Sequence, residues 1–231
     1  MTPDQMKRAA AEAVLPFIKS GMKLGLGTGS TARHFVDCIG ELVKKKAFDL
    51  VCVPTSEATR QQAQNLGIKL TTLDQEPVLD LTVDGADEID DKLNLIKGGG
   101  GALLREKIVA SSSRQMIVIA DGTKHVKTLG AFPLPIEVVP FGARATAYKI
   151  ERCFAHLKLG GAMNVRSRDG KVFITDNGNM IIDCALRAID DPAKLQSYLA
   201  GIPGVVDHGL FIGLAHMAFL GTPKGVVALK R

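Results

Sequence analysis

The stretch TVDGADEIDDKLNLIKGGGGALLREK, residues 82–107, decides the fold of this chain and holds most of its candidate chemistry. It begins inside the run 79–83, which is short, rich in Leu and Val, and predicts a buried strand. Asp84 and Asp87 follow directly after that run. Because open α/β sheets bind ligands beyond the carboxyl ends of their strands, we expect both carboxylates to lie in an active site.

The second half of this stretch places a lysine before a glycine-rich helix start. Lys97 precedes the four glycines 98–101, and residues 102–111 predict a helix that carries Glu106. Glycine lets the backbone N–H groups at a helix start approach a negative charge closely. Glu106 lies either on the inner side of this helix or at the surface between its two cationic neighbours.

Residues 1–128 alternate between apolar runs and amphipathic segments in the order βαβα. This order predicts a parallel sheet with right-handed crossovers, whose carboxyl-end loops share one edge. We therefore expect the loops near residues 30, 85, 98 and 122 to converge. The expected strands are 22–26, 50–53, 68–73, 79–83 and 116–120, and the expected helices are 34–43, 57–66 and a first helix that starts at Pro3 and includes Phe17.

The second part of the chain has a different character. We read 132–135 as a linker, because two prolines so close cannot sit in a central strand. The strands expected after it are 136–139, 162–167, 172–175, 180–184 and 205–211, with helices at 143–157 and 192–199. That order is close to a ferredoxin-like split βαβ module, and a closing strand at 226–229 returns to the first sheet. We expect an α/β protein: a Rossmann-like parallel-sheet domain of residues 1–128 and 208–231, with an inserted α+β ferredoxin-like domain of residues 129–207.

Composition limits the classes of protein to which the chain could belong. The net charge of +5 over 231 residues suits anionic small molecules or nucleic acid, but the basic run 44–46 lacks the interleaved aromatics of a nucleic-acid site. The four cysteines show no C-x-x-C pair, and the N-terminus shows no apolar signal region. The longest weakly polar stretch, 209–221, is too short for a membrane helix. We expect a cytoplasmic protein without zinc or disulfides that binds neither nucleic acid nor membrane.

The sequence GLGTGS at 25–30 is a glycine loop between an expected strand and an expected helix. A dinucleotide fingerprint would need Gly or Ala where Ser30 stands, and an acid at the end of the second strand, where none occurs. A P-loop would need a lysine before Ser30. The loop fits one phosphate, bound by free N–H groups and the hydroxyls of Ser30 and Thr31, and fits equally well a tight turn without a ligand.

The remaining candidates also have plain structural alternatives. Asp84 and Asp87 suit a turn and a helix cap, and Lys97 and Lys124 suit solvent exposure. The acidic cluster 88–91 is alternatively a Mg²⁺ site. A phosphate loop, two carboxylates, a lysine before a glycine nest and a further carboxylate together supply a sugar-phosphate site with proton-transfer machinery and no fixed cofactor signature.

Four motifs follow one another in a fixed order. They are GTGST at 27–31, DGADEID at 84–90, KGGGGAL at 97–103 with REK at 105–107, and ADGTK at 120–124. Together they resemble the type A ribose-5-phosphate isomerases, whereas GTGST alone also occurs in other sugar-phosphate proteins. The resemblance covers nearly the whole chain, more loosely in the second half, and includes TSEATR at 55–60, FPLPIEVVP at 132–140 and TDNGN at 175–179.

This resemblance implies interconversion of D-ribose 5-phosphate and D-ribulose 5-phosphate in the non-oxidative pentose phosphate pathway. Glu106 then looks like the general base that moves a proton between C2 and C1 through an enediol(ate). Lys97 and the N–H groups of glycines 98–100 would stabilise charge on the enediolate oxygen. Asp84 and Asp87 would hold sugar hydroxyls, with Asp84 also assisting ring opening.

The resemblance implies the remaining properties as well. It predicts no metal and no organic cofactor, and it predicts a homodimer or homotetramer with the inserted domain as a contact surface. The phosphate would lie against Lys7, Lys124 and residues 28–31. The expected substrate-binding residues are Lys7, Thr28, Gly29, Ser30, Thr31, Asp84, Gly85, Ala86, Asp87, Lys97, Gly98, Gly99, Gly100 and Lys124.

Two other functions compete with this one. The first is a sugar-phosphate-sensing module of a transcriptional regulator, which shares the GTGST-type loop. It would need a DNA-binding segment, and residues 1–20 are too short for a helix-turn-helix with its own core. The second is an amino-sugar phosphate isomerase of related fold.

Overall fold

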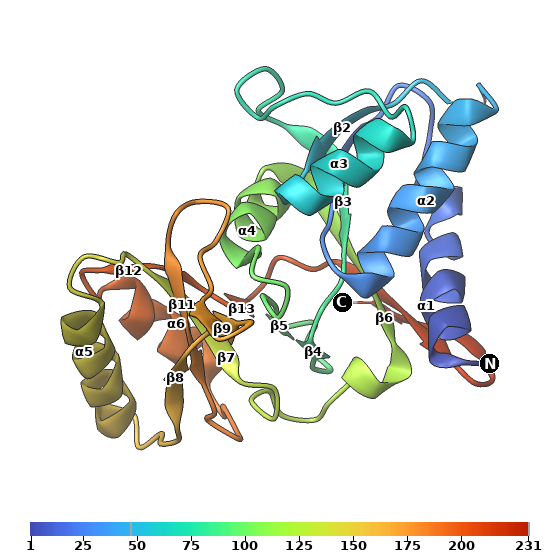
Figure 1. Cartoon of the computed structure of the whole chain (residues 1–231). Helices are drawn as coiled ribbons and strands as arrows, with labels where there is room; N and C mark the ends of the chain where they lie inside the picture. The colour runs from blue at the N-terminus through green and yellow to red at the C-terminus, as the bar shows by residue number, and fades with distance from the viewer. Residues whose placement is uncertain (47, 231) are drawn as a thin grey trace.

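The computed structural model describes residues 1–46 and 48–230; Ala47 and Arg231, which the expected domain ranges include, lie outside them. Two lobes lie side by side (Figure 1). One is built on a six-stranded sheet and the other on a four-stranded sheet. The expected α/β fold with a second α+β module is confirmed.

The six-stranded sheet has the strand order β15-β14-β6-β3-β1-β2. Its first five strands along the chain pair in parallel, and the last strand pairs antiparallel at one edge. Their bounds are β1 (Lys23–Leu26), β2 (Val51–Pro54), β3 (Leu79–Asp84), β6 (Ser113–Asp121), β14 (Met217–Thr222) and β15 (Gly225–Lys230). Strand β14 was not predicted, because 209–221 was interpreted only as a weakly polar stretch.

Helices cover both faces of this sheet, as the alternating side chains of β6 require. Ile117 and Ile119 point into the cluster packed under α1 and α2, whereas Met116, Val118 and Ala120 point into a second cluster on the other face. Both faces are therefore apolar. The helices of this lobe are α1 (Pro3–Glu12), α2 (Ser30–Lys44), α3 (Glu57–Asn65) and α4 (Leu103–Ser111), with short 3₁₀ turns η1 (Leu15–Phe17) and η2 (Gly122–Lys124).

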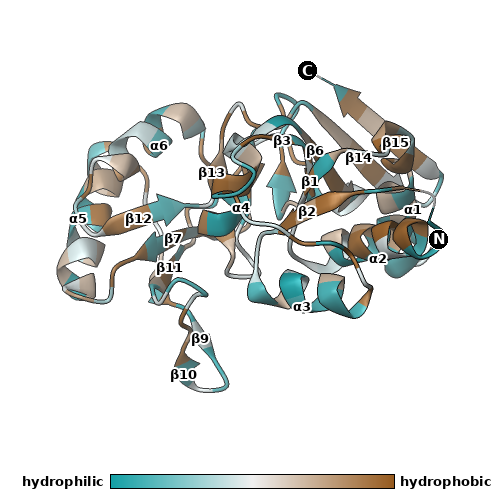
Figure 2. Ribbon diagram, turned by 90° about the horizontal axis from the view of Figure 1, so that it is seen from above, coloured by the Kyte–Doolittle hydropathy of each residue, from teal (hydrophilic) through white to brown (hydrophobic). Residues whose placement is uncertain are grey.

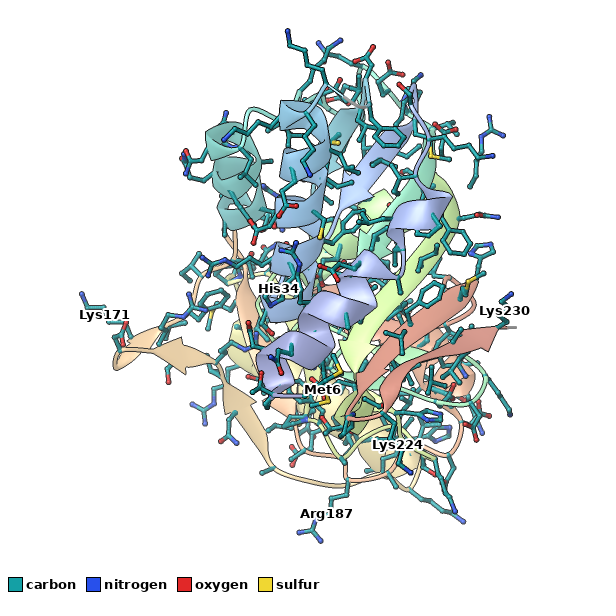
Figure 3. All side chains as sticks on the ribbon, turned by 90° about the vertical axis from the view of Figure 1, so that its right-hand side faces the viewer. Met6, His34, Lys171, Arg187, Lys224 and Lys230 are labelled. Carbon is teal, nitrogen blue, oxygen red and sulfur yellow. The ribbon has the colours of Figure 1, made fainter. Side chains whose placement is uncertain are left out.

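The second lobe has the ferredoxin-like order βαββαβ. Its antiparallel sheet runs β12-β7-β11-β8, and apolar residues of α5 and α6 share one cluster with the central strands. A small hairpin projects from the lobe (Figure 2), with Lys171 at its tip (Figure 3). The bounds are β7 (Leu134–Val138), α5 (Ala143–His156), β8 (Met163–Val165), β9 (Ser167–Arg168), β10 (Lys171–Val172), β11 (Met180–Cys184), α6 (Pro192–Ala200) and β12 (Val205–His208).

A third, small sheet was not predicted. It pairs the two-residue strands β4 (Glu88–Ile89), β5 (Leu95–Ile96) and β13 (Leu210–Phe211) in the order β13-β5-β4. Because β13 follows β12 almost directly, the expected strand 205–211 is in fact two strands that belong to different sheets. This small sheet joins the lobes beside the glycine loop.

The expected linker 132–135 was partly wrong, because Pro135 lies inside the central strand β7. Its missing N–H costs no ladder bond. The Pro135 carbonyl accepts from Gly209 N just past the end of β12, and the Gly209 carbonyl accepts instead from Lys97 N. Pro135 therefore lies opposite Gly209, whose carbonyl oxygen already has a donor in Lys97 N and does not need an N–H group from position 135.

Other expected boundaries were also wrong. Residues 68–73 form no strand and make only a single bridge from Leu70 to Cys52, at the edge of the large sheet. The first helix ends at Glu12, and Phe17 lies in a 3₁₀ turn that begins just before Pro16. The expected strands 162–167 and 172–175 are shorter, because the chain turns at Arg166 and enters the hairpin. The division at 128/129 and 207/208 stays a prediction.

Candidate active site

A pocket of about 200 Å³ opens at the carboxyl edge of the six-stranded sheet. Its walls come from the segments that follow β1, β3 and β6 and from the glycine loop before α4. These loops meet because parallel strands deliver their carboxyl ends to one edge. The lining residues are Lys7, Thr28, Gly29, Ser30, Thr31, Gly85, Ala86, Asp87, Lys97, Gly98, Gly99, Gly100, Glu106, Asp121, Thr123 and Lys124.

The loop after β1 turns the N-terminus of α2 toward the pocket. Gly29 has φ of 113°, a backbone conformation that glycine adopts without strain, and α2 begins at the next residue. The free N–H groups and the macrodipole of a helix start favour an anion there. Lys7 Nζ, from α1, donates to Ser30 Oγ at 3.0 Å and brings a cation to the same place.

Thr28 anchors this loop from behind. Its Oγ1 lies 2.7 Å from the hydroxyl of Thr55, 2.8 Å from that of Ser56 and 3.1 Å from that of Thr59, all of which are buried. The Thr28 hydroxyl is therefore engaged behind the wall of the pocket. The sequence analysis missed this hydroxyl cluster, although the spacing of Ser and Thr in TSEATR at 55–60 was its signal.

Three buried charged side chains lie together at the base of the pocket. Lys97 Nζ is 3.1 Å from Asp84 Oδ2 and 3.2 Å from Glu106 Oε1, and it also donates to the Gly85 carbonyl at 2.7 Å. Lys97, Asp84 and Glu106 are 2%, 0% and 4% exposed. Solvent exposure of the lysine and a surface position for Glu106 are both excluded, and one ammonium serves two carboxylates in a low-dielectric site.

Burial and mutual repulsion shift the proton affinities of these groups. The pKa of Glu106 is raised to about 8, mainly by burial and then by the charge of Asp84, while Lys97 acts against both. Burial raises the pKa of Asp84 as well. Burial lowers the pKa of Lys97, but the two carboxylates outweigh it and the net shift is upward. Lys97 therefore stays charged, and Glu106 can exchange a proton near neutral pH.

Glu106 also has an oxygen available for that proton. Among the residues that the structure describes, Glu106 Oε2 is one of the few buried side-chain oxygens without a hydrogen-bond partner. Its other oxygen faces Lys97, and the side chain lines the pocket. A buried acceptor without a partner, on a residue that lines a pocket, is a candidate general base.

Asp84 lies beneath the pocket and does not line it. Its Oδ1 accepts from Thr28 N at 3.0 Å and from Gly85 N at 2.7 Å. A Cβ at Gly27 would stand 2.1 Å from the same oxygen, so glycine is required there. In this structure Asp84 therefore ties the β1 and β3 loops to Lys97 and does not face the space that a sugar would occupy.

Asp87, in contrast, lines the pocket and contacts the glycine loop. Its Oδ2 accepts from Gly99 N at 2.8 Å. The Gly99 N–H group, expected to face an oxyanion, is thus engaged by Asp87. Gly98 and Gly100 also line the pocket.

The β6 loop contributes two residues that the sequence analysis missed. Asp121 and Thr123 line the pocket beside Lys124, which was predicted. Asp121 Oδ1 accepts from Thr123 N at 3.1 Å and from the Thr123 hydroxyl, and so caps η2. The signal was the cap sequence Asp-Gly-Thr within ADGTK.

The carboxylates of the acidic cluster 88–91 are engaged by groups of the fold. Both oxygens of the buried Glu88 accept backbone N–H groups, from Gly130 and from Phe132, at 2.6 Å. Asp90 closes a turn through backbone and side-chain N–H groups, and Asp91 faces His125. Over residues 1–46 and 48–230, no three His, Cys, Asp or Glu side chains gather as metal ligands.

Catalysis at this pocket is therefore expected to persist in excess EDTA. The carboxylates that Mg²⁺ would use already accept N–H groups of the fold, and Asp84 and Glu106 share the ammonium group of Lys97. The rate should be measured after overnight dialysis against the chelator and compared with a sample given Mg²⁺ afterwards. A loss that Mg²⁺ restores would contradict this expectation.

The fold and the pocket together define a sugar-phosphate isomerase: a helix start that suits an anion and a buried carboxylate with an upward-shifted pKa line the same small pocket. The sequence model of ribose 5-phosphate isomerase A (phosphoriboisomerase A) matches residues 51–225. The chain belongs to the ribose 5-phosphate isomerase A family.

Full-length relatives agree with this assignment. The chain is 59% identical to ribose-5-phosphate isomerase A of Parvibaculum lavamentivorans, over 97% of both chains. It is 57% identical to that of Bradyrhizobium diazoefficiens, over 100% of this chain and 98% of the relative. A D-ribose-5-phosphate isomerase solved in complex with phospho-erythronic acid is 40% identical over the whole of both chains, with a TM-score of 0.93. The enzyme of Plasmodium falciparum is 41% identical over 99% of both chains, also with a TM-score of 0.93.

The expected activity is thereby confirmed: this chain is an isomerase that interconverts ribose 5-phosphate and ribulose 5-phosphate, a reaction of the pentose phosphate pathway. The match over the full chain excludes the regulator module and the amino-sugar isomerase as main functions. No helix within the described ranges is both long and apolar enough to cross a membrane. The roles of individual residues and the oligomeric state stay predictions.

Proposed function

We propose that the pocket carries out this isomerisation with Glu106 as the single proton carrier between C2 and C1, through an enediol(ate). One observation carries the proposal: Glu106 lines the pocket, its Oε2 is buried and unpartnered, and the pKa of its carboxyl is raised to about 8. A base whose pKa lies near the working pH combines the correct protonation state with useful basicity.

The phosphate of the sugar binds at the opposite wall. Ser30 and Thr31 supply hydroxyls and helix-start N–H groups, and Lys7 and Lys124 supply charge. Anchoring this end positions the reacting carbons against Glu106, so phosphate binding contributes to the rate.

The enediolate is stabilised from the side of the glycine loop. Lys97 stays charged beside Glu106, and Gly98 and Gly100 bring backbone N–H groups to the pocket. Asp87 binds sugar hydroxyls. Asp84 contributes by fixing Lys97 and two loops; a direct part in ring opening would require it to become accessible.

We further propose that the protein is a cytoplasmic homodimer or homotetramer, assembled through the inserted domain 129–207. Apolar side chains at Val165, Val172 and Ile174 of this domain are about half exposed, at 47%, 50% and 52%. A second copy of the chain would cover them. All four cysteines are free thiols, which suits a reducing compartment.

A direct assay tests the proposed chemistry. The purified chain is expected to convert ribose 5-phosphate to ribulose 5-phosphate and to leave glucosamine 6-phosphate unchanged. In deuterated water, deuterium should enter the product at C1 to the extent that the Glu106 carboxyl exchanges its proton with solvent during the transfer. Turnover without deuterium exchange that also persists in Glu106→Gln would overturn the single-base enediol route.

A further inference from the structure

We propose that Arg166, contributed by the inserted domain, is a positioning residue that holds the glycine loop 98–101 in its active shape. This inference rests on the function proposed above, since it assigns the loop's orientation to a residue outside the pocket. Arg166 is not among the residues that line the pocket, and it lies 68 residues beyond Gly98 in the sequence. It acts through the backbone.

The Arg166 guanidinium joins the two lobes. Its Nη1 donates to the Gly98 carbonyl at 2.7 Å and to the Gly99 carbonyl at 3.2 Å. Its Nε and Nη2 form a paired contact with Asp183, at 2.8 Å and 2.5 Å. The carboxylate of Asp183 therefore fixes the plane of the guanidinium, and Nη1 remains free to bind two successive carbonyl groups. A lysine ammonium cannot make this set of contacts.

The guanidinium binds the carbonyl oxygens of Gly98 and Gly99, and its position therefore determines where the N–H groups of the same two peptides point. In a trans peptide, the C=O and the following N–H face in opposite directions. The Gly98 carbonyl shares its peptide with the Gly99 N–H, which donates to Asp87 Oδ2 at 2.8 Å. The Gly99 carbonyl shares its peptide with the N–H of Gly100, which lines the pocket. A cation on the carbonyl side also polarises both N–H groups toward the pocket.

The glycine loop 98–101 needs contacts from outside to hold one conformation. Gly98 and Gly101 have φ of 105° and 88°, and consecutive glycines have little intrinsic preference for any one conformation. Phe173 supports the other end of the loop: an added Cβ at Gly101 would stand 2.5 Å from its ring. Phe173 N in turn donates to the Arg166 carbonyl at 2.9 Å. Arg166 and Phe173, which flank the β9–β10 hairpin, thus contact both ends of the loop.

Arg166→Met tests the proposal, with Arg168→Met as the matched control. Arg168 stacks on the same Phe173 ring at 4.6 Å and is exposed, and no hydrogen bond from it to the glycine loop is seen. Arg166→Met is expected to lower kcat for ribose 5-phosphate on the order of 10²-fold, because the N–H groups lose their alignment. Arg168→Met should leave kcat unchanged.

Binding measurements separate positioning from general damage. Inorganic phosphate binds at the α2 end, which Arg166 does not contact, so its affinity should be unchanged in Arg166→Met. Phospho-erythronic acid carries a carboxylate as well as a phosphate and should bind more weakly. Equal weakening of both ligands would show a merely structural role and overturn the proposal, as would an unchanged kcat.

Chemical rescue supplies a second variant. Adding guanidinium ion to Arg166→Ala should restore part of kcat, whereas Arg168→Ala should not respond. If neither Arg166 variant folds, Arg166→Lys keeps the charge and the stem, and a wild-type kcat in that variant would overturn the need for a fork. The proposed function is judged separately: wild-type turnover that is lost in Glu106→Gln supports it whatever Arg166 does.

Discussion

Glu106→Gln is expected to lower kcat on the order of 10³-fold while ribose 5-phosphate still binds. The amide has the shape of the carboxyl group but cannot accept the C2 proton. Substrate affinity should persist, because the phosphate is held at the α2 end by Lys7, Ser30 and Lys124. Turnover is measured by a coupled assay and binding by calorimetry with the inactive variant. Near wild-type turnover would refute Glu106 as the base.

The pH profile of the wild type is part of the same test. Glu106 must be deprotonated to accept a proton, and its pKa is raised to about 8. The value of kcat/KM for ribose 5-phosphate should therefore fall as pH drops through that region, whereas an ordinary glutamate would place this limb near pH 4. Glu151→Gln, an exposed glutamate of α5, is the control and should change neither rate nor profile.

The sequence predicted those parts of the fold whose signals are local. Glycine loops after apolar runs, the capping box at Thr2 and the DNG turn before β11 each fix a boundary by nearby residues. The strands of the small third sheet could not be seen, because two residues carry no periodicity. Pro135 misled for a related reason: whether a missing N–H matters depends on the neighbour, and Gly209 lies 74 residues away in the sequence (209 − 135).

The same distinction applies to the site. Motifs predicted the residues that come together at the pocket, since carboxyl-end loops of parallel strands share one edge. The motifs could not predict which of these side chains line the pocket and which lie beneath it. Asp84 and Asp87 are three residues apart in one motif, yet only Asp87 lines the pocket. They also could not reveal Arg166, because its partners in the glycine loop are backbone carbonyls, which carry no side-chain signature.

Lys97→Met is expected to damage both stability and catalysis. Removing the ammonium leaves Asp84 and Glu106 buried without a counter-charge, which should cost about 3–5 kcal/mol in the free energy of unfolding. It also removes the cation nearest the developing enediolate, so kcat should fall about 10²–10³-fold. Denaturant unfolding and steady-state kinetics measure the two effects separately.

The double variant Asp84→Asn with Lys97→Met separates the effect on stability from the effect on kcat. It removes one charge of each sign, so part of the lost stability should return while kcat stays low. Recovery of kcat along with stability would instead mean that Lys97 serves only the fold.

The pH dependence of Lys97→Met then shows how Lys97 contributes to the rate. Lys97 lowers the pKa of Glu106, so without it the Glu106 pKa should rise above 8 and the limb of kcat/KM should move to higher pH. If the lysine only tunes the base, the rate above the new limb should approach that of the wild type. If it stabilises the enediolate, the deficit should persist at every pH, and we expect this second result, because Lys97 itself lines the pocket.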